Sequence, residues 1–142
     1  MHNIALAANP GATMDQLEVE IAKLPEVALH VEHLFAHKTY ARVLHIPAGT
    51  VLTGKEHRHA TINILLKGRI RISATNEEPR DMEAPAIFVS QPGCRRAGLA
   101  IEDTIWVNVH GTEETDLEKI EAEHIVPHVN PMLDYTTRRI TP

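Results

Sequence analysis

Two histidines separated by a single residue, His57 and His59, have the spacing in this chain that most directly indicates chemistry. They lie in the segment 49–72, which reads GTVLTGKEHRHATINILLKGRIRI. Side chains two positions apart on a β-strand point to the same face of the sheet. An extended segment would therefore let both imidazoles bind one metal ion or ligand, whereas a polar loop at GKEHRH would leave both histidines in solvent.

A metal site needs a third donor, and the sequence offers two. Three neutral imidazoles can bind zinc, iron, manganese or nickel with a coordination position left open. His110 ends the extended segment 104–110 (TIWVNVH) and has the same strand parity as Trp106. His45 has the same parity as Val43, which we expect to point inward. Either histidine could instead lie at the surface, so the third ligand stays open at this point.

Two other side chain types could contact a ligand. An arginine that faces the interior can hold a carboxylate or phosphate through two parallel hydrogen bonds. Arg95 and Arg96 follow the turn at Pro92-Gly93, and for Arg95 we favour a position in solvent. Trp106 would be part of the core or a wall on which a ligand stacks, and we favour the core.

Short alternating runs separated by glycine and proline predict that strands position these residues. The expected strands cover residues 27–32, 40–46, 50–66, 69–74, 86–90, 98–101 and 104–110, with a bend near Gly54 and a polar turn at 76–79. This pattern is typical of an all-β sandwich or barrel.

A helix is expected at each end of the strand region. Residues 14–24 show apolar residues at helical spacing, with Thr13 as the N-cap and Pro25 as the stop. Thr115 with Glu118 fits a capping box for a second helix. We therefore divide the chain into an N-terminal helical segment (1–26), a β-barrel (27–112) and a C-terminal helix and arm (113–142). Apolar residues of the arm could cover the domain or a neighbouring subunit, or belong to a loose tail: Met132, Leu133 and Tyr135.

Composition fits one globular domain of 142 residues. The net charge of −5, from 19 acidic and 14 basic residues, argues against general nucleic-acid binding. The lone cysteine, Cys94, cannot form an internal disulfide. No apolar run approaches the roughly 20 residues of a membrane span, and the N-terminus lacks a signal-peptide pattern. We expect a soluble, cytoplasmic protein with no membrane partner.

The histidine pair followed by a strand, a glycine and a second strand resembles the first motif of the cupins, a family of small β-barrels. That motif reads glycine, five residues, His-x-His, three or four residues, Glu, six residues, Gly. The second motif has a Pro-x-Gly turn, a histidine and an asparagine, and residues 85–110 are the analogous segment. The resemblance implies a double-stranded β-helix, or jelly roll, and a divalent transition metal. It also ranks His110 ahead of His45, since His110 lies in the second motif.

The chain departs from this pattern at several positions. Seven residues separate Gly49 from His57, and the family glutamate falls on Asn63, whose amide oxygen could still bind a ligand or metal. Gly68 comes two residues early, and Arg96 stands near the position of the second-motif histidine. A fixed cation in place of a metal ligand favours an anionic ligand as a hypothesis.

The phrases EHLFAHKTYARVLHIPAGT, NILLKGRIRI and RRAGLAIEDTIWVNVHGTEETDLEKIE are similar to small cupin-like proteins encoded by bacteriophages. Three functions stay open. The chain could bind a small anionic or sugar-like ligand, with or without a metal. It could be a metal-dependent isomerase or oxygenase. It could be a structural or interaction protein of a phage particle or an infected cell, located on the virion. A homo-oligomer, by default a dimer, is expected.

Overall fold

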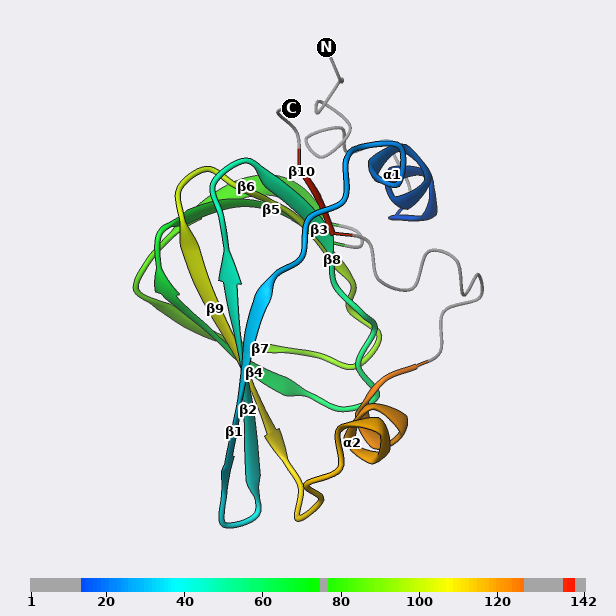
Figure 1. Ribbon diagram of the computed structural model, residues 1–142, viewed down its shortest axis with the longest axis vertical. Helices are drawn as coiled ribbons and strands as arrows, with labels where there is room; N and C mark the ends of the chain where they lie inside the picture. Colours follow the sequence, from blue (N-terminus) through cyan, green and yellow to red (C-terminus); the bar gives the residue numbers. More distant parts are fainter. Residues whose placement is uncertain (1–13, 75–76, 127–136, 140–142) are drawn as a thin grey trace.

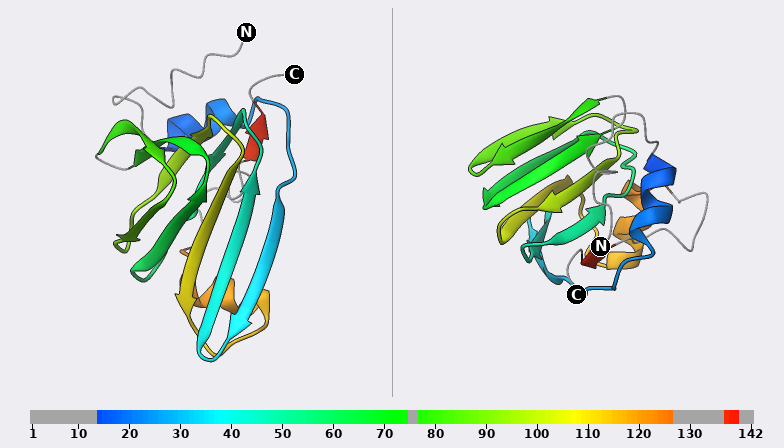
Figure 2. Two further views of the ribbon diagram at one scale, coloured as in Figure 1. Left: turned by 90° about the vertical axis from the view of Figure 1, so that its left-hand side faces the viewer. Right: turned by 90° about the horizontal axis from the view of Figure 1, so that it is seen from above.

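The computed structural model describes residues 14–74, 77–126 and 137–139, whose strands form two facing antiparallel sheets (Figures 1 and 2). Across the first sheet lie β1 (His30–Ala36), β2 (Thr39–Ile46), β9 (Thr104–Gly111), β4 (Thr61–Lys67) and β7 (Ala86–Ser90). Across the second lie β10 (Thr137–Arg139), β3 (Thr50–Thr53), β8 (Arg96–Ala100), β5 (Arg69–Ala74) and β6 (Glu77–Glu83). From β2 onward the described strands alternate between the sheets, except at the β5–β6 pair.

The core lies between the sheets because apolar residues recur at every second position of the central strands. On β4, for example, Asn63 and Leu65 are buried while Ile62 and Leu66 are exposed. Both sheets contribute buried side chains to one cluster: Leu44, Ile46, Leu65 and Trp106 from the first sheet, and Ile70, Ile72, Met82 and Ala100 from the second. The inward face of each sheet is therefore fixed, and so is the direction of every polar side chain on these strands.

The two helices pack at different places on the sandwich (Figure 1). α1 (Met14–Ile21) contacts β3 and β8, where Ile21 and Leu24 pack with Val51 and Ala97. α2 (Leu117–His124) follows β9 and lies at the other end of the molecule. Its buried residues, Ile120 and His124, face the interior. None of the helices among the described residues is long and apolar enough to cross a membrane.

The strand expected over residues 50–66 is wrong as a single element. The structure has two strands there, β3 and β4, in different sheets, and residues 54–60 connect them. The connection is held by backbone hydrogen bonds from Gly54 N to Arg96 O (2.7 Å) and from Arg58 N to His124 O (2.8 Å). The two histidines of the pair therefore lie in a loop, and the strand argument for their common direction does not apply.

The turn expected at 76–79 is also wrong for residues 77–79, which belong to β6. This strand carries five charged residues and almost no apolar alternation, so it has no strand pattern in the sequence. Charged side chains are typical of an edge strand, and Arg71 on β5 pairs with Asp81 across the hairpin at 2.8 Å. The strands expected at 69–74 and 86–90 are confirmed as β5 and β7.

Several helix and strand boundaries differ from those expected from the sequence. α1 ends at Ile21 rather than at residue 24, β1 begins at His30 rather than at 27, and β8 covers Arg96–Ala100 rather than 98–101. The N-cap of α2 is Asp116, not Thr115, because its carboxylate accepts from the backbone N–H groups of Glu118 and Lys119.

No strand pair within the described ranges joins the two sheets, so they form a sandwich rather than a closed barrel. Thr13, Met132, Leu133 and Tyr135 lie outside the described residues.

Candidate functional site

A cavity of about 840 Å³ lies between the sheets and is capped by α2. Its size falls within the range of about 300–1,000 Å³ that is usual for small-molecule sites. Leu44, Leu52, Ile70 and Ile72 form an apolar part of its wall. Polar side chains also line it: His33, Tyr40, Arg42, His57, Asn63, Ser90, Arg96, Asn108, His110 and His124. The cavity can thus receive a ligand that has both apolar and polar groups.

Three imidazoles gather where α2 meets the sandwich, and we call them the imidazole cluster: His57, His110 and His124. The ring centroids of His57 and His110 are 5.2 Å apart, and those of His110 and His124 are 4.9 Å apart. Nδ1 of His57 is hydrogen-bonded to Oγ1 of Thr61 at 2.9 Å, and His110 stacks on Tyr40 at 5.8 Å. The rings of His57 and His110 are therefore oriented by neighbours from β4 and β2.

Burial keeps the cluster uncharged at neutral pH. Desolvation, with a smaller effect of His124 and two arginines, lowers the pKa of His57 from 6.5 to about 4. Desolvation and the neighbouring His57 and His124 lower the pKa of His110 to about 4 as well. The pKa of His124 is also lowered by burial. Neutral imidazoles can each accept and donate one hydrogen bond.

One buried nitrogen of the cluster has no hydrogen-bond partner among the described residues. His124 is 5% exposed, and this nitrogen is its Nε2. The carboxylate of Glu123 lies 3.8 Å from this nitrogen, which is too long for a hydrogen bond. A buried polar atom without a partner costs about 1–3 kcal/mol. The structure therefore leaves an unsatisfied nitrogen on a residue that lines the cavity.

Asn63 is the centre of a hydrogen-bond network on the cavity floor. Its amide oxygen accepts from Asn108 Nδ2 at 2.6 Å and from Trp106 Nε1 at 3.2 Å. Its amide nitrogen donates to Ser90 Oγ at 2.6 Å and to the carbonyl of Thr61 at 3.2 Å. Because these bonds use both ends of the amide, Asn63 positions its neighbours.

Charged side chains of both signs line the cavity: Glu26, Arg42, Lys55, Arg96 and Glu121, of which Lys55 is paired with Glu121. Arg96 on β8 donates to Ser90 Oγ, and its guanidinium lies 4.9 Å from the centre of the Phe88 ring. Arg42 on β2 lines the same cavity. The structure therefore places the predicted Arg96 and Trp106 at the wall of one cavity and brings Asn63 into contact with Trp106.

The three predicted metal ligands, His57, His59 and His110, do not all lie close to one another. His57 and His110 are neighbours, whereas His59 is exposed and its ring lies 5.5 Å from that of His124. Within the described part of the chain, three metal-ligating atoms come within 4.8 Å of one another only at His30, Glu32 and His45. The imidazole cluster as placed does not fit a preassembled metal centre, and no chemical step is derived through a metal there.

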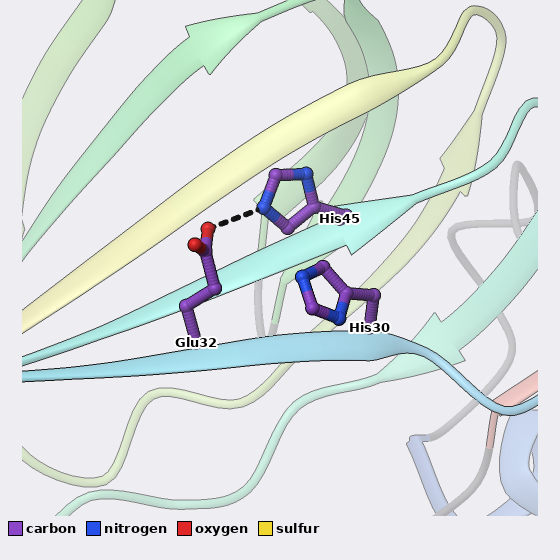
Figure 3. A group of neighbouring side chains, drawn as sticks. All are labelled: His30, Glu32 and His45. Atoms are coloured by element: carbon purple, nitrogen blue, oxygen red, sulfur yellow. Dashed lines mark hydrogen bonds and ion pairs between the residues drawn. The ribbon is translucent and has the colours of Figure 1, made fainter.

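His45, the alternative third ligand, does not face the cavity. The cavity is lined on β2 by Tyr40, Arg42, Leu44 and Ile46, so His45 lies on the opposite side of the sheet. There its Nε2 is 2.6 Å from the carboxylate of Glu32 (Figure 3). The expectation that His45 and Val43 point inward is wrong, because Tyr40 and Leu44 set the opposite parity for β2.

Sequence reasoning missed part of the site. Alternation on β9 places Asn108 beside His110, and alternation on β2 places Arg42 beside Tyr40, so strand parity could have found them. Ser90 ends β7 on the inward face and carries a similar signal. The sequence groups His124, or Ile125, with Leu117 and Ile120 on one face of the expected helix, but helical spacing does not tell that this face meets the strands.

No protein-family model matches the chain, and no curated protein matches it. Solved structures do. A KdgF structure from Halomonas sp. has a TM-score of 0.54 and 17% identity over 65% of this chain and 87% of that one. An RmlC-like cupin from Shewanella frigidimarina has a TM-score of 0.52 and 14% identity over 75% of this chain and 93% of that one. An RmlC-like cupin with a double-stranded β-helix from Methanocaldococcus jannaschii has a TM-score of 0.50 and 14% identity over 66% and 86%. These likenesses give the chain a cupin-like double-stranded β-helix fold.

Proposed function

We propose that this cupin-like protein binds a small anionic ligand, such as a carboxylate- or phosphate-bearing sugar-like molecule, in the cavity between its sheets. The observation that carries the proposal is the composition of the wall. Arg96 supplies a fixed positive charge, and the imidazole cluster supplies neutral hydrogen-bonding groups beside it. The unpartnered Nε2 of His124 adds a group that a ligand would satisfy.

Each group of cavity residues would contact a different part of the ligand. The guanidinium of Arg96 can hold two oxygens of a carboxylate or phosphate side by side. His110 and His124 can hydrogen-bond hydroxyl or carbonyl groups without adding charge. The apolar wall of Leu44, Leu52 and Ile70 would cover the less polar face of the ligand, as in most small-molecule sites. Binding of this kind needs no metal.

The proposal can be tested through a natural probe, because Trp106 is the single tryptophan of the chain and lines the cavity. Its fluorescence would be titrated with sugar acids, sugar phosphates, simple carboxylates and the matching neutral sugars. We expect saturable changes with anionic compounds and weak or no changes with the neutral ones. Equal responses to charged and neutral compounds, or no response to any of them, would contradict the proposal.

Arg96→Gln is the informative variant and Arg95→Gln is its matched control. Both remove one positive charge from adjacent positions, but only Arg96 lines the cavity. Loss of a charge-assisted hydrogen bond costs about 1.5–3 kcal/mol, so the Kd for the anion should rise by about tenfold or more for Arg96→Gln. An equal effect of the two substitutions would indicate general electrostatic attraction instead of a site.

The bacteriophage origin, the virion location and the enzymatic alternative stay predictions. The metal-dependent isomerase or oxygenase would need three ligands around one ion in the cavity. The side chains described there bring His57, His110 and His124 near one another without meeting that condition. A binding function is therefore better supported than turnover.

A further inference from the structure

A second histidine cluster lies on the outer face of the first sheet, away from the cavity: His30, Glu32 and His45 (Figure 3). The pairing of β1 with β2 creates it. His30 and His45 are directly opposite each other in the antiparallel register, and Glu32 is two residues beyond His30 on the same strand. All three side chains thus share one face, while Val31 and Leu44 on the other face line the cavity.

The donor atoms of this outer cluster lie near one another. One ligating atom from each residue lies within 4.8 Å of the other two. The rings of His30 and His45 have centroids 4.9 Å apart, and Nε2 of His45 is 2.6 Å from Oε2 of Glu32. A tetrahedral ion with ligand bonds of about 2.0–2.2 Å would require small side chain rotations. No change in the strands is needed.

An ion pair between Glu32 and His45 accounts for less of this three-residue arrangement than a metal site does. The pair of Glu32 with His45 is exposed on both sides, at 48% and 36%, and such surface pairs contribute only about 0–1 kcal/mol. It also leaves the position of His30 unexplained. Two imidazoles and one carboxylate form a donor set that suits zinc, with the remaining position open to water.

We infer that His30, Glu32 and His45 bind one Zn²⁺ ion on the outer face of the β1–β2 hairpin, separately from the cavity. β1 is an edge strand that pairs with β2 alone among the described strands. An ion shared by both strands would fasten this edge to the sheet. Binding to the folded chain would also raise its stability through mass action.

The test uses untagged full-length protein and zinc chloride in isothermal titration calorimetry near neutral pH. We expect one site in the wild type. Glu32→Gln and His45→Ala should each raise its Kd at least about tenfold, since even outer partners of metal ligands have effects of that size. His37→Ala is the matched control, because His37 is an exposed histidine in the turn of the same hairpin. Its Kd should equal that of the wild type.

Thermal unfolding with and without zinc gives an independent measurement. Zinc should raise the Tm of the wild type and of His37→Ala but not that of Glu32→Gln, whose side chain keeps the shape of the original. Zinc binding that survives in both Glu32→Gln and His45→Ala would overturn the inference. Binding lost in His110→Ala instead would assign the ion to the imidazole cluster and also overturn it. If zinc does not bind at the outer cluster, the proposal of anion binding in the cavity is unaffected, because the zinc-site variants and the anion-site variants change different residues.

Discussion

At the scale of single residues, the environment of each histidine decides its chemistry. His57 and His110 lie in a desolvated pocket beside arginines, which favours their neutral form. His45 lies at the surface beside a carboxylate, and its hydrogen bond lowers the pKa of Glu32. The same side chain type thus supplies uncharged hydrogen-bonding groups on one face of a sheet and part of an ionic cluster on the other.

The buried pair predicts how stability depends on pH. The pKa of His57 and of His110 is about 4 in the folded chain and near 6.5 when unfolded, so the unfolded chain takes up these protons first. Their contribution is fully present above about pH 6.5, is lost as the pH falls, and levels off below about 4. Allowing for partial solvent access, we expect a loss on the order of 2 kcal/mol for the two groups.

The measurement is urea unfolding at several pH values between these limits. The double variant His57→Gln/His110→Gln removes both titrating groups, so its stability should fall less steeply with acid than that of the wild type. His37→Gln, which removes an exposed histidine, serves as the control. Parallel curves for the wild type and the double variant would show that these imidazoles do not titrate as their burial indicates.

Asn63 should be the most sensitive polar residue of the cavity. Asn63→Ala leaves Asn108, Trp106 and Ser90 without a partner that each now has. Ser90 keeps its hydrogen bond from Arg96, so two groups are orphaned. Each orphaned buried group costs about 1–3 kcal/mol, so the free energy of unfolding should drop by about 2–6 kcal/mol. Asn108→Ala removes only one bond to Asn63 and should cost less. Chemical denaturation of both variants compares them, and the reverse order would contradict the role of Asn63 as the centre of the network.

The candidate site could be predicted from the sequence only in part. Parity along a single strand is sufficient to group Trp106, Asn108 and His110, because alternation is a local rule. The partners of these residues come from other strands and from α2, and their approach depends on register and packing. His59 shows the limit, since its spacing from His57 carries no directional information once both lie in a loop.

At the scale of elements, the turns decide whether the predicted strands can pair. Gly68 joins β4 to β5 and has a φ of +90°, a conformation that side chains with a Cβ rarely adopt. A Cβ at this position would also collide with the carbonyl oxygen of Asp103 and come within 2.8 Å of Thr104 Oγ1. The glycine in the sequence therefore marks a close approach of two chain segments as well as a turn.

Substitution at two glycines separates these effects. Gly68→Ala combines an unfavourable φ with the collision, whereas Gly93→Ala has a φ of +85° and nothing within 4 Å of the added Cβ. We expect Gly93→Ala to cost about 1 kcal/mol and Gly68→Ala clearly more, beyond about 2 kcal/mol. Thermal unfolding monitored by circular dichroism measures both. Equal losses would mean that the neighbouring backbone moves aside without cost.

β5 was predictable from its apolar alternation, and β7 from a short apolar run between Pro85 and the turn at 91–93. The prediction failed at β6, whose charged edge has no alternation, and across 50–66, where two strands of different sheets follow each other with a short connection. A sequence pattern reports which residues can be extended. It does not report where the chain leaves one sheet for the other, because that depends on the packing of both.

At the scale of the whole molecule, the outer face of the first sheet is apolar across β9, β4 and β7, beside the outer cluster on β1 and β2. β4 and the edge strand β7 present aliphatic residues on that side, and several are well exposed: Ile62 (44%), Leu66 (57%), Ile87 (72%) and Val89 (55%). Neighbouring positions in the register add Val107, Val109 and Ile64. Exposed apolar patches of this kind mark interaction surfaces. An apolar patch of this kind complements itself, because a twofold axis through it would bring apolar side chains of two copies together without opposing like charges.

We therefore expect a homodimer formed through this apolar patch. Ile87→Lys should shift the protein toward monomer in sedimentation equilibrium, since a charge would have to be buried against the partner. Val19→Lys is a matched control, because Val19 is similarly exposed (48%) but lies on α1. A monomeric wild type at all concentrations, or a dimer insensitive to Ile87→Lys, would contradict this arrangement.

The pairing of β10 with β3 has a consequence for how the protein can be shortened. β10 contributes only three residues, yet it is the neighbour that occupies the outer side of β3 in the second sheet. Removing residues 137–142 would expose the backbone N–H and C=O groups of β3 as an open template for another chain. A truncated form would then tend to self-associate and precipitate even though the cavity and the outer cluster lie elsewhere. By pairing with β3, β10 covers an edge at which another chain could otherwise add a strand.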